Sequence, residues 1–274
     1  MYIYQEVLEI FLFYGEKEER LIMKKYRVIG IIPARFGSTR LSGKPIADIA
    51  GKPMVQWVVE NACNAESLSE VIVATDDVRI YDSVKSFGGN VVMTPTEISS
   101  GTDRVAYAAR NVDADIIVNI QCDEPFIRPD EIDSVARILI EDSEAKMGTL
   151  VKRMTDNSEL NNKNIVKVVM DRAGNCLYFS RSPIPFFRDM DSDDWIKEFK
   201  YYKHIGIYSF RKDFLMEYSE WEVTPLESTE RLEQLRVLEN GYRIKAAETQ
   251  YEHICVDSPQ DLERARSLAE RFKN

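Results

Sequence analysis

From Tyr26 onward, short runs of β-branched residues alternate with amphipathic stretches, and this alternation limits the possible folds more than any other feature. Such a rhythm is typical of βα units, whose strands pair in parallel. The strand runs are apolar throughout, which indicates burial on both faces of a sheet. The predicted strands span residues 28–34, 70–75, 90–94 and 115–121. The predicted helices span residues 54–65, 78–87 and 102–111.

The pattern changes after about residue 140. Two β-rich runs, 166–171 and 176–181, flank a turn and predict an antiparallel hairpin. The later segments predict a polar mobile loop at 188–200, a strand at 204–210, one helix at 226–240 and a C-terminal helix at 259–272. We therefore predict an α/β fold with a mostly parallel, Rossmann-like sheet flanked by helices. The hairpin would be an insertion that forms a smaller lobe, at about 164–210.

The chain has a net charge of -10, which argues against a nucleic-acid surface because phosphate backbones are bound by basic patches. The apolar run at 7–14 is far shorter than the roughly 20 residues that span a bilayer. We therefore expect neither nucleic acid nor a membrane as a partner. Four isolated cysteines favour a reducing cytoplasm over a disulfide framework.

Residues 1–24 are predicted to be an N-terminal extension, and we assign them no function. They fit an upstream translation start, with Met23 as the natural first residue, or a disordered or loosely docked helix. Residues 25–274 are predicted to form one catalytic domain that includes the hairpin lobe.

The loop after the first predicted strand, 31–45, combines Arg35, Arg40 and Lys44 with small and turn-forming residues. Small residues let backbone N–H groups approach phosphate oxygens, and the cations neutralise them. The loop matches neither the Walker A nor the Rossmann glycine pattern. Because ligands of open α/β sheets bind at the carboxyl ends of strands, this position predicts a phosphate cradle, and a basic surface loop is the alternative.

Acidic residues follow a buried strand and precede the last helix. Asp123 and Glu124 come directly after the apolar run 115–121, where a carboxylate is costly unless it meets a cation. Oxygen ligands of this kind suit magnesium. Asp257 would leave a short strand before the C-terminal helix, and either a metal ligand or a helix cap fits it.

The chain has two histidines, and neither has a motif of its own. His204 alone would be interpreted as a strand histidine with a satisfied hydrogen bond. His253 follows Glu252 in a predicted loop, and we expect it to be solvated.

Together, several segments resemble the CMP-Kdo synthetase family of the CMP-sugar synthetases, where Kdo is 3-deoxy-manno-octulosonate. The resemblance runs from about residue 28 to 268. The segments, in chain order, are IIPARFGSTRLSGKP, SSGTDRV, NIQCDEP, VKVVMD with LYFSRSPIP, KHIGIY, PLESTERLEQLRVLENG and VDSPQDLE.

The resemblance implies a nucleotide-diphospho-sugar transferase sheet and a magnesium-dependent transfer of CMP from CTP to the anomeric hydroxyl of Kdo, releasing pyrophosphate. This reaction belongs to the synthesis of lipopolysaccharide or a related surface polysaccharide. The CTP-binding residues it implies are Ala34, Arg35, Ser38 and Lys44. The magnesium ligands it implies are Asp123 and Asp257, which with Arg35 and Lys44 form the catalytic set. The sugar-binding residues it implies are Arg104, Gln121, His204, Tyr208, Glu233 and Gln234, with Arg104 meeting the sugar carboxylate. For the assembly, a homodimer is the default expectation, because exposed apolar hairpin faces often form dimers.

Two positions depart from the family pattern. Cys122 stands where the family has glycine, and Ser42 stands where it has proline. The thiol of Cys122 would either point into the core or narrow the space near the reacting centre. The alternatives are therefore another acidic 2-keto sugar as substrate, such as 8-amino-Kdo or a sialic-acid-like nonulosonate. A hexose-1-phosphate nucleotidyltransferase and a non-catalytic nucleotide-binding regulator are the more distant alternatives.

Overall fold

The computed structural model describes residues 25–37, 41–98 and 100–272, and the extension at 1–24 lies outside them. A nine-stranded sheet dominates the fold, with the order β11-β7-β10-β6-β1-β4-β5 and the hairpin β8–β9 attached to β10. The strands are β1 (Val28–Ala34), β4 (Leu68–Thr75), β5 (Asn90–Met93), β6 (Ile116–Asn119), β7 (Met147–Arg153), β8 (Lys167–Met170), β9 (Cys176–Ser180), β10 (Tyr202–Arg211) and β11 (Ile244–Thr249). A separate antiparallel pair joins β2 (Asp48–Ile49) to β3 (Lys52–Pro53).

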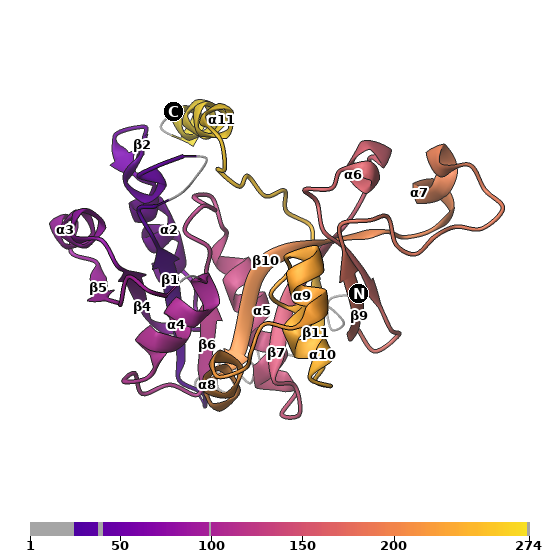
Figure 1. The fold of residues 1–274 in the computed structure, drawn as a ribbon. Coiled ribbons are helices and arrows are strands. Elements are labelled where there is room, and N and C mark those ends of the chain that lie inside the picture. Colours follow the sequence, from indigo (N-terminus) through magenta and orange to yellow (C-terminus); the bar gives the residue numbers. More distant parts are fainter. Residues whose placement is uncertain (1–24, 38–40, 99, 273–274) are drawn as a thin grey trace, which may run out of the picture.

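Helices cover both faces of the sheet (Figure 1). The α-helices are α2 (Met54–Cys63), α3 (Val78–Ser86), α4 (Gly101–Ala109), α5 (Pro129–Glu141), α6 (Asn157–Asn161), α7 (Trp195–Glu198), α8 (Lys212–Ser219), α9 (Pro225–Glu230), α10 (Leu235–Glu239) and α11 (Pro259–Ala269). Three 3-10 helices are η1 (Lys44–Ile46), η2 (Ser192–Asp194) and η3 (Glu270–Phe272).

Alternate residues of β1 enter two different cores, as expected for a strand that is buried on both faces. Val28 and Ile32 pack with α2, α3 and α5, whereas Ile29 and Ile31 pack with α4, α8 and α10. The four strands predicted for the first half are present, and the prediction of a mostly parallel sheet with an antiparallel hairpin is confirmed.

β10 runs antiparallel to its neighbours β6 and β7. It is ten residues long, and only Tyr208 to Arg211 pair with β6. The first half of β10 therefore continues past the carboxyl end of β6. The predicted site residues Gln121 and Asp123 follow that end of β6.

The helix predicted at 226–240 is wrong, because the chain forms α9 and α10 with a break between them. Arg231 has a left-handed backbone, with φ of 54°, and it ends α9. A buried ion pair holds the two helices together, since both nitrogens of the Arg236 fork donate to the Glu227 carboxylate at 2.7 and 2.6 Å. Glu233 lies between the two helices and lines a cavity.

The polar segment 188–200 also differs from its prediction as a loop. It contains η2 and α7, and the ring of Trp195 is buried beside Tyr201. The predicted strand before Asp257 is also wrong, because residues 250–257 form neither helix nor strand.

Candidate active site

The loop after β1 delivers Lys44 to the carboxyl edge of the sheet. Gly43 begins η1 with φ of 70°, and a β-carbon there would lie 3.1 Å from the ring of Phe36. A glycine thus allows both the left-handed turn and the close approach. Arg35 is exposed beside this turn, and Ala34 is buried in the core, so only its backbone can face a nucleotide. Ser38 and Arg40 lie outside the described residues.

Lys44 connects the two carboxylates that were predicted to bind metal. Its Nζ lies 2.7 Å from Asp123 Oδ2 and 3.0 Å from Asp257 Oδ1. Burial acts to lower the pKa of Lys44, but the charge of Asp123 and the hydrogen bonds to both carboxylates outweigh it and raise the pKa. The ammonium group therefore holds together two carboxylates that come from distant parts of the chain.

The same carboxylates suit a hard divalent cation. One ligand atom each from Asp123, Asp257 and Cys255 lie within 4.8 Å of one another. Two carboxylates on one cation is a donor set that fits magnesium. Asp257 is not the cap of α11, which was the alternative to a metal ligand. Ser258 caps this helix and forms a capping box with Asp261.

A larger cavity, of about 800 Å³, lies beyond these carboxylates and is lined by five of the predicted sugar residues. Those residues are Gln121, His204, Tyr208, Glu233 and Gln234. An irregularity in the pairing of β10 between Ile205 and Tyr208 brings the rings of His204 and Tyr208 together, with centroids 5.4 Å apart. Burial lowers the pKa of His204 to about 3, so its ring is neutral at physiological pH.

Gln234 offers an unused donor in this cavity. Its side-chain oxygen accepts a hydrogen bond from the Tyr208 hydroxyl at 3.3 Å. The side-chain nitrogen of Gln234 is buried and has no hydrogen-bond partner among the described residues. A buried unpaired donor costs free energy of order 1–3 kcal/mol. A ligand with a hydroxyl acceptor would remove that cost.

A chain of hydrogen bonds connects Gln121, just after β6, to Glu233 in the wall of the larger cavity. Gln121 donates to Asn119, Asn119 donates to Thr102, and Thr102 donates to Glu233 at 3.3, 3.0 and 2.8 Å. Burial raises the pKa of Glu233 to about 7. Thr102 and Asn119 were not among the predicted site residues, although both lie within the segments that carried the family resemblance.

Arg104 lies apart from the other predicted sugar residues. Its side chain is 2% exposed, and its guanidinium donates to Asp76 at 2.7 Å, to the carbonyl of Ile98 at 2.9 Å and to the hydroxyl of Thr94. Arg104 does not line the larger cavity. It lines a second, smaller cavity, together with Lys44. The expected contact between Arg104 and the sugar carboxylate therefore finds no support in this geometry, because the cationic fork is already engaged.

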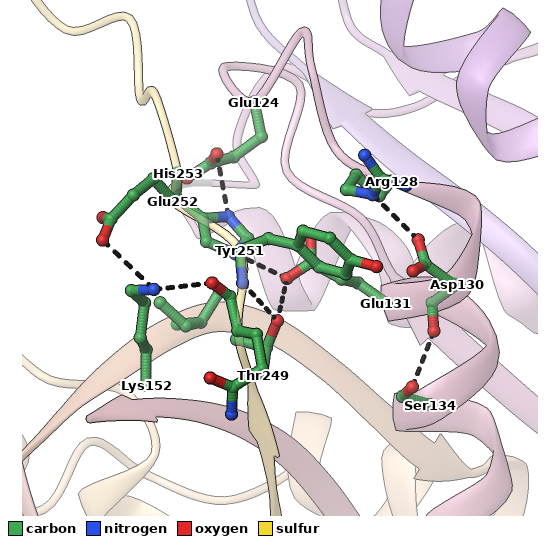
Figure 2. Close-up of polar contacts among 12 residues, drawn as sticks. Glu124, Arg128, Asp130, Glu131, Ser134, Lys152, Thr249, Tyr251, Glu252 and His253 are labelled. Carbon is green, nitrogen blue, oxygen red and sulfur yellow. Dashed lines mark hydrogen bonds and ion pairs between the residues drawn. The ribbon is translucent and has the colours of Figure 1, made fainter.

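The structure also decides the positions of Cys122 and His253, for which we stated expectations from the sequence. Cys122 is 7% exposed and packs within the core cluster, which is the first of the two orientations considered for its thiol. The expectation of a solvated His253 is wrong, because its ring is largely buried between Glu124 and Glu131 (Figure 2). Lys203 and Glu159, which form an ion pair and line the larger cavity, were not singled out.

The smaller cavity, of about 250 Å³, contains Arg35 and Lys44, and it meets the larger one at three residues. Gln121, Asp123 and Asp257 line both cavities. A cationic loop, paired carboxylates and an adjoining polar cavity at the carboxyl edge of a parallel sheet define a nucleotidyltransferase type of site.

Comparisons with known proteins identify the family. A cytidylyltransferase family model matches residues 29–246. A 3-deoxy-manno-octulosonate cytidylyltransferase of Solibacter usitatus is 52% identical over 88% of this chain and 94% of its own length. One from Geobacter metallireducens is 49% identical over 90% of this chain and 99% of its own length. A solved CMP:2-keto-3-deoxy-manno-octonic acid synthetase complexed with CTP superposes with a TM-score of 0.84 and 40% identity, covering 90% and 99% of the two chains. The chain belongs to the cytidylyltransferase family, among its 3-deoxy-manno-octulosonate cytidylyltransferases.

No helix in the described part of the chain is both long enough and apolar enough to cross a bilayer.

Proposed function

We propose that this protein transfers CMP from CTP to the anomeric hydroxyl of Kdo, giving CMP-Kdo and pyrophosphate, for the synthesis of lipopolysaccharide or a related polysaccharide. The observation that carries the proposal is the meeting of the two cavities at Gln121, Asp123 and Asp257. A nucleotide in the smaller cavity and a sugar in the larger one would present their reacting atoms to the same pair of carboxylates.

On the nucleotide side, Arg35 and Lys44 would bind the triphosphate of CTP. Both side chains line the smaller cavity, and charge-assisted hydrogen bonds to phosphate are stronger than neutral ones. Asp123 and Asp257 would hold magnesium, which would supply neutralising charge at the α-phosphate and favour ionisation of the attacking hydroxyl. Arriving phosphate oxygens would give Lys44 a new anionic partner, so that the ammonium group could leave the carboxylates.

On the sugar side, five residues that line the larger cavity would orient Kdo. His204 is neutral, and its Nε2 lies 3.0 Å from the Thr149 hydroxyl, so Nδ1 is the ring nitrogen that would meet the sugar. Gln234 would give its unused N–H to a sugar hydroxyl, and Glu233 would accept from another. Fixed orientation of the sugar hydroxyl against the α-phosphorus is the main contribution of these residues to the rate.

The test is incubation with CTP, magnesium and, separately, Kdo, 8-amino-Kdo and N-acetylneuraminate. We expect pyrophosphate release and a CMP-sugar product to be fastest with Kdo. No release with any of the three sugars would contradict the reaction, and Kdo as the poorest of them would contradict the substrate. Cys122 borders the smaller cavity and packs in the core, so it gives no reason to prefer an amino-substituted sugar.

We also propose a cytoplasmic homodimer, as the sequence led us to expect. The hairpin lobe presents Leu177 at 59% exposure and Phe186 at 76%, and burial of such side chains favours association. Light scattering during size-exclusion chromatography would give the mass directly, and Leu177→Glu should shift a dimer toward the monomer.

A further inference from the structure

The segment 250–257 carries Asp257 to the active site without any regular secondary structure. It connects the end of β11 to α11 and runs as a long open stretch of chain in Figure 1. Its backbone reaches the loop after β6 through the Val256 N–H, which donates to the carbonyl of Asp123 at 2.9 Å. Because strand or helix hydrogen bonds do not fix this segment, this single backbone contact and the contacts of its side chains set the position of Asp257 relative to Asp123.

His253 provides the most buried of these side-chain contacts (Figure 2). Its Nε2 lies 2.8 Å from Glu131 Oε1, and its Nδ1 lies 3.3 Å from Glu124 Oε2. All three side chains are largely buried: the exposed fraction is 10% for His253, 3% for Glu131 and 16% for Glu124. Glu131 also accepts a hydrogen bond from Thr249, at the end of β11, at 2.6 Å. One imidazole thus joins the segment to the first turn of α5 and to the loop that carries Asp123.

Both ring nitrogens of His253 face carboxylate oxygens, which only accept hydrogen bonds when ionised. A doubly protonated ring can donate to both, whereas a neutral ring can donate to only one. Burial acts to lower the pKa of His253, but the hydrogen bonds and charges of Glu124 and Glu131 outweigh it and raise the pKa to about 9. Burial also raises the pKa of Glu124, and a proton on either partner leaves a hydrogen bond between the Glu124 carboxyl group and the His253 ring.

We propose that His253 is a positioning residue, whose contacts with Glu124 and Glu131 hold Asp257 at the correct distance from Asp123 for a shared divalent cation. Glu124 directly follows Asp123, and His253 lies four residues before Asp257. The contacts of His253 therefore hold the two segments that carry these carboxylates next to each other. The proposal rests on the proposed function for its consequence in catalysis. Its geometry depends only on the contacts of His253.

The first test measures activity against magnesium concentration for His253→Ala. Residues that orient metal ligands typically change metal affinity by about 10–100-fold when they are removed. We expect half-maximal activity to need about tenfold more magnesium. The turnover number at saturating magnesium and the Michaelis constant for Kdo should stay within about threefold of the wild-type values. An unchanged magnesium requirement would overturn the proposal.

Two companion variants make the test specific. His253→Gln keeps one N–H donor, so it should show a smaller rise in the magnesium requirement, and it also serves if His253→Ala does not fold. Arg128→Ala is the matched control, because Arg128 contacts the same segment through the ring of Tyr251, at 4.1 Å, but is exposed. The control should leave the magnesium requirement unchanged.

Direct Mn²⁺ binding, measured with a non-hydrolysable CTP analogue present, distinguishes failure of this proposal from failure of the proposed function. An inactive wild-type protein whose Mn²⁺ affinity fell about tenfold in His253→Ala would contradict the reaction and support the positioning role. Hydrogen exchange gives a further check, since 250–258 should exchange faster in His253→Ala while β1 and β6 do not change. Faster exchange throughout the sheet would indicate a general structural role and would overturn the proposal.

Discussion

The two cavities that meet at Asp123 and Asp257 are built by different physical means. The smaller one is organised by charge: the side chains of Lys44, Asp123 and Asp257 are 12%, 25% and 36% exposed, and they are held by ion pairs. The larger one also has charged side chains in its wall, but its predicted sugar residues are joined by ring stacking, as between His204 and Tyr208, and by the hydrogen bonds that lead to Glu233. Ion pairs can exchange partners when a charged ligand arrives, whereas fixed donors and acceptors discriminate between patterns of hydroxyl groups.

The largest effect on turnover should come from a substitution at Asp123, which lines both cavities. Asp123→Asn removes one of the two carboxylates proposed for magnesium, and we expect turnover to fall at least about a hundredfold with the fold intact. Steady-state rates at saturating magnesium, with circular dichroism as the folding control, would measure this. Retention of more than about a third of the wild-type activity would contradict the assignment.

Lys44 should separate the two cavities kinetically. Lys44→Ala removes the proposed charge-assisted contact to the triphosphate, and we expect the Michaelis constant for CTP to rise roughly 10–100-fold. Lys44→Arg should recover only part of this loss, because a guanidinium fork differs in shape from an ammonium group. The Michaelis constant for Kdo should stay within about threefold, and an equal rise for both substrates would show that the cavities are not independent.

Glu233, in the larger cavity, should make the stability of the protein depend on pH. Because its folded pKa is raised to about 7, its buried charge costs stability that appears as pH rises from about 4.5 and is complete above 7. Relative to Glu233→Gln, the wild-type free energy of unfolding should therefore fall over that window, by on the order of 2 kcal/mol. Urea titrations of both proteins at pH 4.5 and pH 8 would measure it. Parallel changes in the two proteins would show that Glu233 is not the group responsible.

Cys122 should have the smallest effect. Cys122→Gly removes a thiol from the core, and we expect the melting temperature to fall by a few degrees, from a loss of about 1 kcal/mol. The order of preference among Kdo, 8-amino-Kdo and N-acetylneuraminate should not change. A reordered preference would place this side chain in contact with the sugar.

Local patterns predicted the sheet, the family resemblance supplied five residues that line the larger cavity, and long-range contacts account for the errors. β1 begins and ends at the predicted residues because an apolar run of that length has one stable environment, between two layers of helices. The break at Arg231 depends on a left-handed backbone and a buried ion pair between Glu227 and Arg236, while the periodicity of the segment is helical throughout.

Partners that are distant in sequence explain why His253 was wrongly expected to be solvated and why the assignment of Arg104 to the sugar stays a prediction. Arg104 was assigned to the sugar because its segment matches the family, but its guanidinium is bound by Asp76, 28 positions away. His253 meets Glu124 and Glu131, which are 129 and 122 positions away, and no pattern around His253 indicates them. Charge neighbours across the fold decide the role of each of these side chains.

The ion pair between Lys44 and Asp257 closes a loop of 213 residues. Contacts between such distant residues form slowly, because the chain must be ordered over its whole length before they can stabilise it. On heating, the irregular segment that carries Asp257 can open while the sheet remains folded, since proteins unfold locally at lower free energy than globally. Regain of activity during refolding should therefore lag behind recovery of β-sheet structure, and thermal inactivation should precede melting.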